Sequence, residues 1–311
     1  MILTVTLNAS VDITYLLDKF QLGKTNRALN ITKTAGGKGL NVTRVLNQVG
    51  NKAVATGIIG GTTGSFIKSR LNEQEIKHHF FEIDQESRNN ISIITGKLQT
   101  EILEAGPKLS SETCTNFLNF YHEIINDFDT IVVSGSLPQG LNHDYYSKLT
   151  EVAVNEGKKL LLDTSGSALK ASISSSIKPM LIKPNEHELE SLINRKVEVK
   201  DMGVLKKYLS MPLFNGIEWI VLTLGSEGAL VKHRECFYEI KVPKINAINA
   251  IGSGDSVVAG LALGIDQNES TEKILLRSMA YGVLNALDEH PGHLKLDELD
   301  AIKNNITINR V

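Results

Sequence analysis

The 311-residue sequence has little cysteine, little net charge and no long apolar run, and each shortage excludes a class of protein. Its two cysteines, Cys114 and Cys236, lie far apart and in no metal-ligand or redox spacing. A disulfide scaffold is therefore excluded, and we expect a reducing, cytoplasmic environment. The formal net charge of −2 provides no overall field for binding nucleic acid or an anionic membrane, so we expect neither partner.

Membrane-spanning and secretory segments are also missing. No apolar run approaches the roughly 18 residues that span a bilayer. The apolar start, Met1–Leu7, is too short for a signal peptide and lacks its basic leader, so we interpret it as a buried first strand. With 41% hydrophobic and 22% charged residues, the composition is typical of a soluble globular protein with a large core.

Short β-branched runs alternate with amphipathic helical patterns through most of the chain. The predicted strands are Ile2–Leu7, Val54–Ile59, Thr130–Ser134, Lys159–Asp163, Met180–Lys183 and Trp219–Thr223. The predicted helices are Leu40–Val49, Ser65–Glu73, Asp144–Asn155, Glu186–Ile193 and Val204–Leu209. This alternation predicts an α/β fold with a doubly wound, mostly parallel sheet that helices cover on both faces. In such sheets, ligands bind beyond the carboxyl ends of the strands.

Two stretches, residues 12–33 and 88–106, interrupt that alternation. Each has the pattern of short strands and turns without a helix, and Ile91–Thr95, Gly96-Lys97 and Leu98–Leu103 together predict a hairpin. We expect the two stretches to form a small β-sheet lid within a single domain spanning residues 1–311. Exposed strand edges favour pairing with a second copy, which predicts a homodimer through the lid.

The most informative motif is Asn249–Val257, which reads Asn-Ala-Ile-Gly-Ser-Gly-Asp-Ser-Val. Its glycines allow a tight turn in which the backbone N–H groups of Gly252, Ser253 and Gly254 point into one small volume. The helical run that follows adds the positive end of its dipole, so the motif predicts an anion hole. Asp255 has two interpretations here: a base that takes a proton from an attacking hydroxyl, or a helix N-cap.

A second glycine-rich helix start, Thr34–Asn41, contains Lys38. It lacks the Walker A spacing, but Gly36, Gly37 and Gly39 allow close approach to a polyhydroxy or phosphorylated ligand, and Lys38 supplies positive charge. The alternative is a simple turn with a solvated lysine, which this density of glycines makes less favourable.

Two further segments follow predicted strands. In Lys183–Glu188, the residues Asn185 and Glu188 have the spacing of a capping box, and the same side chains suit Mg²⁺-bound water. His187 between them lacks the partner pattern of a zinc site. Thr223–Gly228 is a polar loop that could receive a ribose or the outer phosphates, or could be an ordinary tight turn.

Three charged residues lie in or beside the lid segments. Asp12 interrupts an apolar run, so it either faces a sugar or ends a strand. Arg27 and Arg88 could simply be solvated arginines on the surface. If the lid covers a pocket, their guanidinium groups are suited to bidentate binding of a substrate phosphate.

Together these motifs resemble the ribokinase-like, phosphofructokinase B family of carbohydrate kinases over essentially the whole chain. Ala35–Arg44 resembles the first signature of that family, and Asn249–Asp255 resembles its second. The resemblance implies a three-layer α/β/α fold and a kinase that uses ATP and Mg²⁺ to phosphorylate a ketohexose phosphate. The segments Gly36–Gly50, Val133–Gly140 and Pro212–Trp219 point to D-tagatose 6-phosphate, with fructose 1-phosphate as the alternative.

The resemblance also implies roles for single residues. Asp255 would be the base, with Gly252, Ser253 and Gly254 stabilising the transferred phosphoryl group. The implied substrate-binding residues are Asp12, Gly36, Gly37, Lys38, Asn41, Arg88 and Arg27. The implied nucleotide-binding residues are Lys183, Asn185, Thr223, Gly225, Ser226, Gly228, Gly252, Gly254 and Asn285. Asn185 and Glu188 would organise Mg²⁺ through water.

Some residues depart from the pattern of that family. Ala9 and Ala250 replace prolines, which preorganise loops rather than perform chemistry. The segment Asp288–His293 stands where related chains tend to show a Thr-Gly pair near the adenine. These changes concern loop rigidity and nucleotide affinity and leave Asp255 in place.

Two other classes of protein remain open. One is a non-catalytic sugar-phosphate or nucleotide sensor, against which the intact Gly-Ser-Gly-Asp sequence argues. The other is a nucleoside kinase, against which Lys38 together with Arg88 argues, because that pair suits a phosphorylated sugar.

Overall fold

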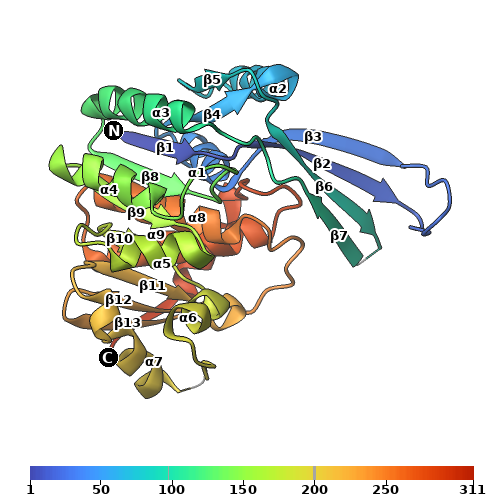
Figure 1. Ribbon diagram of the computed structural model, residues 1–311. Helices are drawn as coiled ribbons and strands as arrows, with labels where there is room; N and C mark the ends of the chain where they lie inside the picture. Colours follow the sequence, from blue (N-terminus) through green and yellow to red (C-terminus); the bar gives the residue numbers. More distant parts are fainter. Residues whose placement is uncertain (97, 199–200) are drawn as a thin grey trace.

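The centre of the molecule is a ten-stranded sheet in the computed structural model, which describes residues 1–96, 98–198 and 201–311 (Figure 1). Its strands are β1 (Ile2–Thr6), β4 (Val54–Gly60), β5 (Phe81–Ile83), β8 (Thr130–Ser134), β9 (Lys159–Asp163), β10 (Leu181–Ile182), β11 (Trp219–Thr223), β12 (Ala229–His233), β13 (Cys236–Lys241) and β14 (Thr307–Arg310). Their order is β14-β13-β12-β11-β10-β9-β8-β1-β4-β5. The pairs from β5 to β11 are parallel, and β12, β13 and β14 extend that edge in antiparallel fashion.

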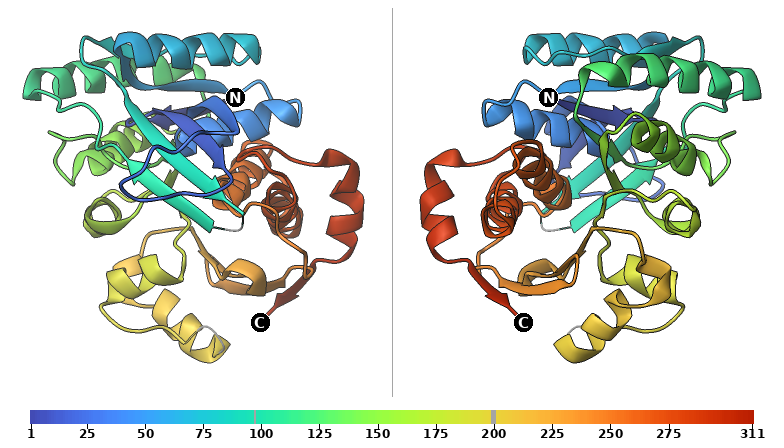
Figure 2. Two further views of the ribbon diagram at one scale, coloured as in Figure 1. Left: turned by 90° about the vertical axis from the view of Figure 1, so that its right-hand side faces the viewer. Right: turned by 90° about the vertical axis from the view of Figure 1, so that its left-hand side faces the viewer.

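Helices cover both faces of this sheet (Figure 2). One face carries α3 (Ser111–Ile124), α4 (Tyr145–Asn155), α5 (Gly166–Ser174), α6 (Glu186–Ile193) and α7 (Met202–Leu209). The other carries α1 (Lys38–Gln48), α8 (Ser253–Asp266), α9 (Thr271–Ala286) and α10 (Leu299–Asn304). Short 3₁₀ turns lie at η1 (Ile125–Asp127), η2 (Pro212–Phe214), η3 (Gly225–Glu227) and η4 (Leu296–Glu298). The predicted doubly wound α/β fold is confirmed.

Each face of the sheet has its own apolar core because successive strand residues point to opposite sides. In β8, Ile131 and Val133 pack under α3 and α4, whereas Val132 packs under α1 and α8. All three side chains are buried. Burial on both faces explains why these strands are continuous apolar runs in the sequence.

A second sheet projects as a long arm from the carboxyl end of β1 (Figure 1). Its strands are β2 (Ser10–Leu17), β3 (Asn30–Gly36), β6 (Arg88–Thr95) and β7 (Leu98–Leu103), in the order β3-β2-β6-β7. We call this four-stranded sheet the lid. Its base packs on α2 (Gly61–Glu73), where Val11 and Ile13 contact the cluster that contains Ile67 and Leu71.

Strand register gives the lid two unlike faces. Asp12 pairs with Thr34 on one side and with Asn90 on the other, which places these polar residues on one face. Ile13, one residue on, pairs with Ile91, which in turn pairs with Ile102 on the opposite face. Ile102 and the more distal Ile31, which shares that face, are each 52% exposed. The lid therefore has a polar face and an apolar face that is partly exposed.

The predicted elements are confirmed with small shifts in their ends. α1 begins at Lys38, slightly before the predicted start, because Gly37 is its N-cap. The predicted lid hairpin is present as β6 and β7, and its turn residue Lys97 lies outside the described residues. The strand predicted at Met180–Lys183 is shorter and comprises only β10. Within the described residues, no helix is long and apolar enough to cross a membrane.

Candidate active site

The predicted anion hole is formed where the chain enters α8. Gly252 is the N-cap of this helix and has a φ of 82°, which favours glycine. A side chain at this position would also press against the backbone of Gly292 and against Asn285. The Ser253 N–H donates to the Ala250 carbonyl over 3.2 Å. The other N–H groups in the first turn of α8 lack partners within the helix, so they are suited to bind an anion.

Asp255 lies in the first turn of α8 and is only 6% exposed. Its Oδ2 accepts a hydrogen bond of 2.8 Å from Nδ2 of Asn41 on α1. No side chain caps α8, so the N-cap interpretation of Asp255 is wrong. Burial raises the pKa of Asp255 to about 6, against the attraction of the nearby Lys38. A carboxylate with a pKa close to neutrality is well matched to proton abstraction.

Asp163, at the carboxyl end of β9, is the site residue that sequence reasoning missed. It is 2% exposed, with Oδ1 at 3.2 Å from Nζ of Lys183 and Oδ2 at 3.5 Å from Nζ of Lys38. Burial alone would raise the pKa of this carboxyl, but Lys183 and Lys38 outweigh burial and hold it below the ordinary value. The sequence feature that could have identified Asp163 is a carboxylate at the carboxyl end of a buried strand, because ligands bind at that position.

The two lysines bring positive charge to the anion hole. The ammonium of Lys183 lies 3.3 Å from the position that a Cβ of Gly254 would occupy, beside the start of α8. Asp163 raises the pKa of Lys38, with smaller contributions from Asp255 and Glu188, so Lys38 is charged. These ammonium groups and the α8 dipole favour a phosphate in the same space.

Asn185 and Glu188 form the predicted capping box at the start of α6. The Glu188 N–H donates to Oδ1 of Asn185 over 2.9 Å, and the Asn185 N–H donates to Oε2 of Glu188 over 2.8 Å. The Glu188 charge nevertheless acts on Lys38, so this carboxylate lies near the lysines beside the anion hole. Asn185 pairs with Thr223 in an isolated β-bridge, which joins this segment to the Thr223–Gly228 loop.

The donors present fit Mg²⁺ held mainly through water and ligand oxygens. Across residues 1–96, 98–198 and 201–311, no cluster of His, Cys, Asp or Glu could enclose an ion by itself. Asp163 and Glu188 nevertheless offer carboxylate oxygens around Lys38, and such oxygens suit an ion that retains waters. The zinc alternative at His187 gains no support, since its ring lies only beside Glu190.

The base of the lid supplies a second polar group. Asp12 Oδ1 accepts hydrogen bonds from Ser10 Oγ over 2.7 Å and from Asn90 Nδ2 over 3.0 Å. Gly36 lies so close that a Cβ there would overlap the Asp12 carboxylate, which explains this glycine. The guanidinium of Arg88 donates to the Asn8 carbonyl over 3.0 Å and to Oδ1 of Asn90 over 2.7 Å.

Asn8 connects the lid base to the main sheet. Its Nδ2 lies 3.3 Å from Oγ of Ser136, in the loop after β8, and Gly135 of that loop adjoins Lys38. Arg88 therefore contacts Asn8, and Lys38 adjoins the loop that Asn8 contacts. Two cations linked in this way suit a phosphorylated sugar.

Several predicted site residues have other surroundings. Arg27 lies in the exposed loop that joins the outer ends of β2 and β3, at the opposite end of the lid from Asp12. Within a single chain, Arg27 therefore does not lie close to Arg88. Gly225 and Ser226 are exposed in η3, at the carboxyl end of β11, and Gly228 follows with a φ of 96°. These three residues lie beyond the carboxyl end of a strand, and their role as a nucleotide loop stays a prediction.

Asn285 differs from its predicted place at a pocket wall. It is fully buried, and its Nδ2 donates to the Ile251 carbonyl over 2.8 Å. Its Oδ1 accepts from the Gly292 N–H over 2.7 Å and from Ser256 Oγ over 3.1 Å. Because the whole amide is occupied, Asn285 holds the anion-hole loop in place.

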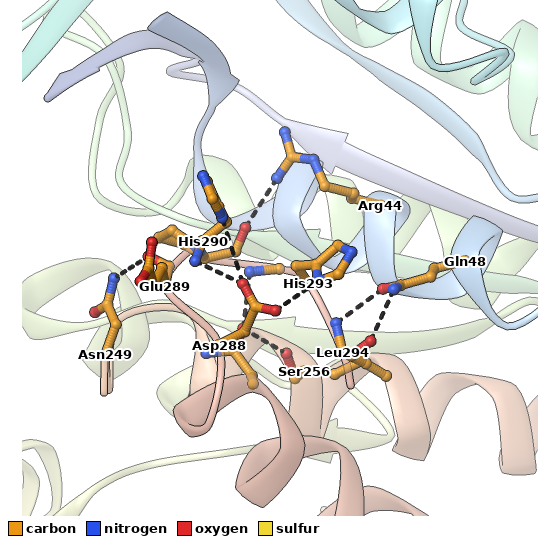
Figure 3. A network of polar contacts seen from close by, with 12 residues as sticks. Arg44, Gln48, Asn249, Ser256, Asp288, Glu289, His290, His293 and Leu294 are labelled. Atoms are coloured by element: carbon orange, nitrogen blue, oxygen red, sulfur yellow. Dashed lines mark hydrogen bonds and ion pairs between the residues drawn. The ribbon is translucent and has the colours of Figure 1, made fainter. Parts of the chain in front are cut away.

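The unusual segment Asp288–His293 forms the network in Figure 3. Asp288 accepts from the His290 N–H and contacts Nδ1 of His293, each over 2.8 Å. Burial acts to raise the pKa of Asp288, but these bonds outweigh it and hold the pKa below its ordinary value. Gln48 of α1 binds the Leu294 backbone through both its amide atoms, at 2.9 Å each. The segment is thus fastened to α1 beside the anion hole.

Fold and site are those of a phosphotransferase that acts on alcohol groups of sugars. Residues 5–295 match the family described as pfkB family carbohydrate kinase, and the chain belongs to that family. It is accordingly a sugar kinase, and kinases of this family generally use ATP with Mg²⁺.

Similar proteins point to a phosphorylated sugar. The chain is 45% identical over 308 residues to a tagatose-6-phosphate kinase of Staphylococcus epidermidis, covering 99% of both chains. It also resembles phosphofructokinase-2 of Escherichia coli in crystal structures with fructose-6-phosphate (TM-score 0.86) and with potassium (TM-score 0.90). In both comparisons the identity is 26%, over 97% of this chain and 98% of the other. Together these similarities support a sugar-phosphate kinase.

Proposed function

We propose that the protein transfers the terminal phosphate of ATP to D-tagatose 6-phosphate, giving D-tagatose 1,6-bisphosphate and ADP. The observation that carries the proposal is the buried Asp255 carboxylate, which lies at the start of α8 with Lys38 close enough to influence its pKa. The substrate follows from the 45% identity to a tagatose-6-phosphate kinase. Fructose 1-phosphate is the alternative acceptor.

Asp255 acts as the base. As the acceptor hydroxyl attacks the γ-phosphorus, its proton passes to the Asp255 carboxylate, the new O–P bond forms and the bond to the ADP oxygen breaks. Negative charge on the moving phosphoryl group is stabilised by the N–H groups at Gly252 and Gly254 and by Lys183. The predicted contribution of Ser253 is not included, because its N–H donates to the Ala250 carbonyl. When bound, Mg²⁺ would neutralise charge on the triphosphate, and Glu188 and Asn185 would hold it through water.

The sugar phosphate lies, in this proposal, between the lid base and α1. Asp12 has a second carboxylate oxygen that accepts nothing from the described residues, and this oxygen would orient a sugar hydroxyl. Arg88 and Lys38 would hold the 6-phosphate with the close backbone of Gly36 and Gly37. The nucleotide would lie along Lys183 and the Thr223–Gly228 loop. The two free cysteines, outside any pairing, suit a cytoplasmic reaction.

The lid also supports a proposed homodimer. Ile31 and Ile102 expose about half of their surface on its apolar face, and the strands β3 and β7 are its open edges. A second copy that covers this face would bury apolar area and satisfy an edge.

The deciding experiment measures ADP release with Mg-ATP and a panel of acceptors: tagatose 6-phosphate, fructose 6-phosphate, fructose 1-phosphate, ribose and adenosine. We expect the highest kcat/KM with tagatose 6-phosphate. Preference for fructose 1-phosphate would keep the mechanism and replace the substrate, and preference for adenosine would indicate a nucleoside kinase. If every acceptor is inert while a sugar phosphate still binds, the protein is a sensor and the proposal fails.

A further inference from the structure

Asn41 contacts Asp255 through one end of its amide and Arg44 through the other. Nδ2 of Asn41 lies 2.8 Å from Oδ2 of Asp255, and Oδ1 accepts a hydrogen bond of 2.9 Å from Nη1 of Arg44. An ionised carboxylate only accepts hydrogen bonds and a guanidinium only donates them. If the Asn41 amide were turned over, its oxygen would face the Asp255 carboxylate and its NH₂ group would face the N–H groups of Arg44. The two partners therefore permit only one orientation of the amide.

Arg44 is itself fixed by backbone from two distant parts of the chain. Its Nη2 donates to the Ala35 carbonyl at the base of the lid over 2.6 Å. Its Nη1 donates to the Pro291 carbonyl over 3.3 Å. Nε lies 3.4 Å from Oε1 of Gln74. The planar guanidinium can serve these acceptors together, whereas a lysine ammonium at the same place could not.

We propose that Arg44 is a positioning residue for Asp255: it holds the Asn41 amide so that the NH₂ group faces the carboxylate. The inference rests on the proposed function, in which Asp255 is the base. Through the Pro291 and Ala35 carbonyls, Arg44 makes this orientation depend on the lid base and on the segment Asp288–His293. Arg44 itself touches no reacting atom in this scheme.

Loss of the Asn41 bond has a defined electrostatic consequence. This hydrogen bond favours the ionised form of Asp255 and partly offsets burial, so its removal should raise the pKa of Asp255 further. The charged groups around Asp255 are Lys38 and Arg44 on α1, Asp163 at the end of β9 and Lys183 after β10. His290 and His293 adjoin Pro291 and contact Asp288, so a control for that segment is required.

The test is the pH profile of kcat/KM for the sugar phosphate, measured on Arg44→Met, Arg44→Lys and wild type. Both variants should shift the acidic limb upward by about one pH unit, the value of one hydrogen bond to a charged group. Turnover at pH 6 should fall roughly fivefold, because the ionised fraction of Asp255 would fall from about one half to about one tenth. Gln48→Leu is the matched control, because Gln48 fastens the same C-terminal segment to α1 and does not touch Asn41. Its limb should stay at the wild-type position.

A double-mutant cycle separates positioning from general damage. Arg44→Met combined with Asn41→Leu should be no worse than Asn41→Leu alone, since Arg44 acts through Asn41. The inference would be overturned if the losses of turnover in the two single variants were additive in the double variant. It would also be overturned if the acidic limb stayed at the wild-type position in the Arg44 variants, or if Gln48→Leu shifted it equally. Thermal unfolding shows whether each variant is folded. If Arg44→Met is not folded, the pH profile of Arg44→Lys tests the inference. If Asp255→Asn keeps wild-type turnover, the proposed function fails, which is a different result from failure of Arg44.

Discussion

Lys183 lies 3.2 Å from Asp163, and both side chains are almost completely buried, at 6% and 1% exposed. The other oxygen of the same carboxylate faces Lys38 at 3.5 Å, so one acid holds two ammonium groups. A buried charge that loses its partner is costly, which makes this carboxylate important for stability as well as for the site.

Asp163→Asn should therefore lower the free energy of unfolding by about 3 kcal/mol and abolish most turnover. The folded-state pKa of Asp163 lies below its ordinary value, so its stabilisation is present above the unfolded pKa and is lost as pH falls through the folded one. Urea unfolding at neutral and acidic pH measures this. Asp129→Asn is the control, because the Asp129 side chain is 78% exposed and an exposed pair contributes about 1 kcal/mol or less. Equal losses in both variants would contradict the prediction.

Asp255→Asn should reduce kcat by at least ~10²-fold and leave sugar-phosphate binding largely intact, because the amide keeps the shape but cannot take a proton. In the wild type, kcat/KM should fall as pH drops below about 6, where Asp255 becomes protonated. Steady-state kinetics and calorimetric binding measure these effects. Asp266→Asn, at the other end of α8, should retain normal turnover. Near-normal turnover in Asp255→Asn would remove it as the base.

The same substitution should stabilise the fold at neutral pH. Burial raises the pKa of Asp255 from 3.8 to about 6, so the ionised form is disfavoured in the folded protein. This costs stability on the order of 3 kcal/mol above pH 6, and the cost disappears as pH falls toward the unfolded pKa. Asp255→Asn should thus have the higher melting temperature at pH 8, with a difference that shrinks on acidification. A pH-independent difference would show that ionisation is not the cause.

Arg88→Ala should raise KM for the sugar phosphate at least ~10-fold, since a hydrogen-bonded charge pair is worth more than about 1.4 kcal/mol, and should change KM for ATP little. Initial-rate kinetics with each substrate varied in turn measure the two constants. Lys19→Ala, in the exposed outer loop of the lid, provides the control and should change neither. Equal increases in both KM values would show that Arg88 does not specifically bind the sugar phosphate.

The lid should determine the oligomeric state. Ile31→Asp combined with Ile102→Asp places two charges on the apolar face, where they would oppose burial against a second copy. Light scattering coupled to size exclusion should show a dimer for the wild type and a monomer for this variant. Gln99→Asp, on the other face of β7, should remain dimeric. A wild-type monomer would end the dimer proposal.

The sequence predicted most of what depends on local pattern. The apolar runs of β1, β8 and β9 and the glycine-rich starts of α1 and α8 are local signals, and the structure has these elements at those places. The antiparallel edge of β12, β13 and β14 was not predicted, because β14 joins through distant residues at the C-terminus.

Long-range pairing also explains the site residues that were missed. Asp163 acquires its importance only from Lys38 and Lys183, which are distant in sequence. Arg44 lies inside a recognised motif, yet its partner Pro291 comes from the far end of the chain. Asn285 was assigned to the nucleotide pocket because its burial could not be deduced from its neighbours in the sequence.

The register of the lid restricts how its length can vary between relatives. From Asp12 to Leu17, and from Asn30 to Gly36, deleting or inserting one residue would turn every following side chain to the opposite face. In the same strand, a deletion at Val11 would move Asp12 to the apolar face and put Ile13 in its place on the polar face. The loop between residues 18 and 29 has no such restriction, since both of its ends already lie at the distal tip. Length differences among homologues should therefore accumulate in this loop and be absent from the strands below it.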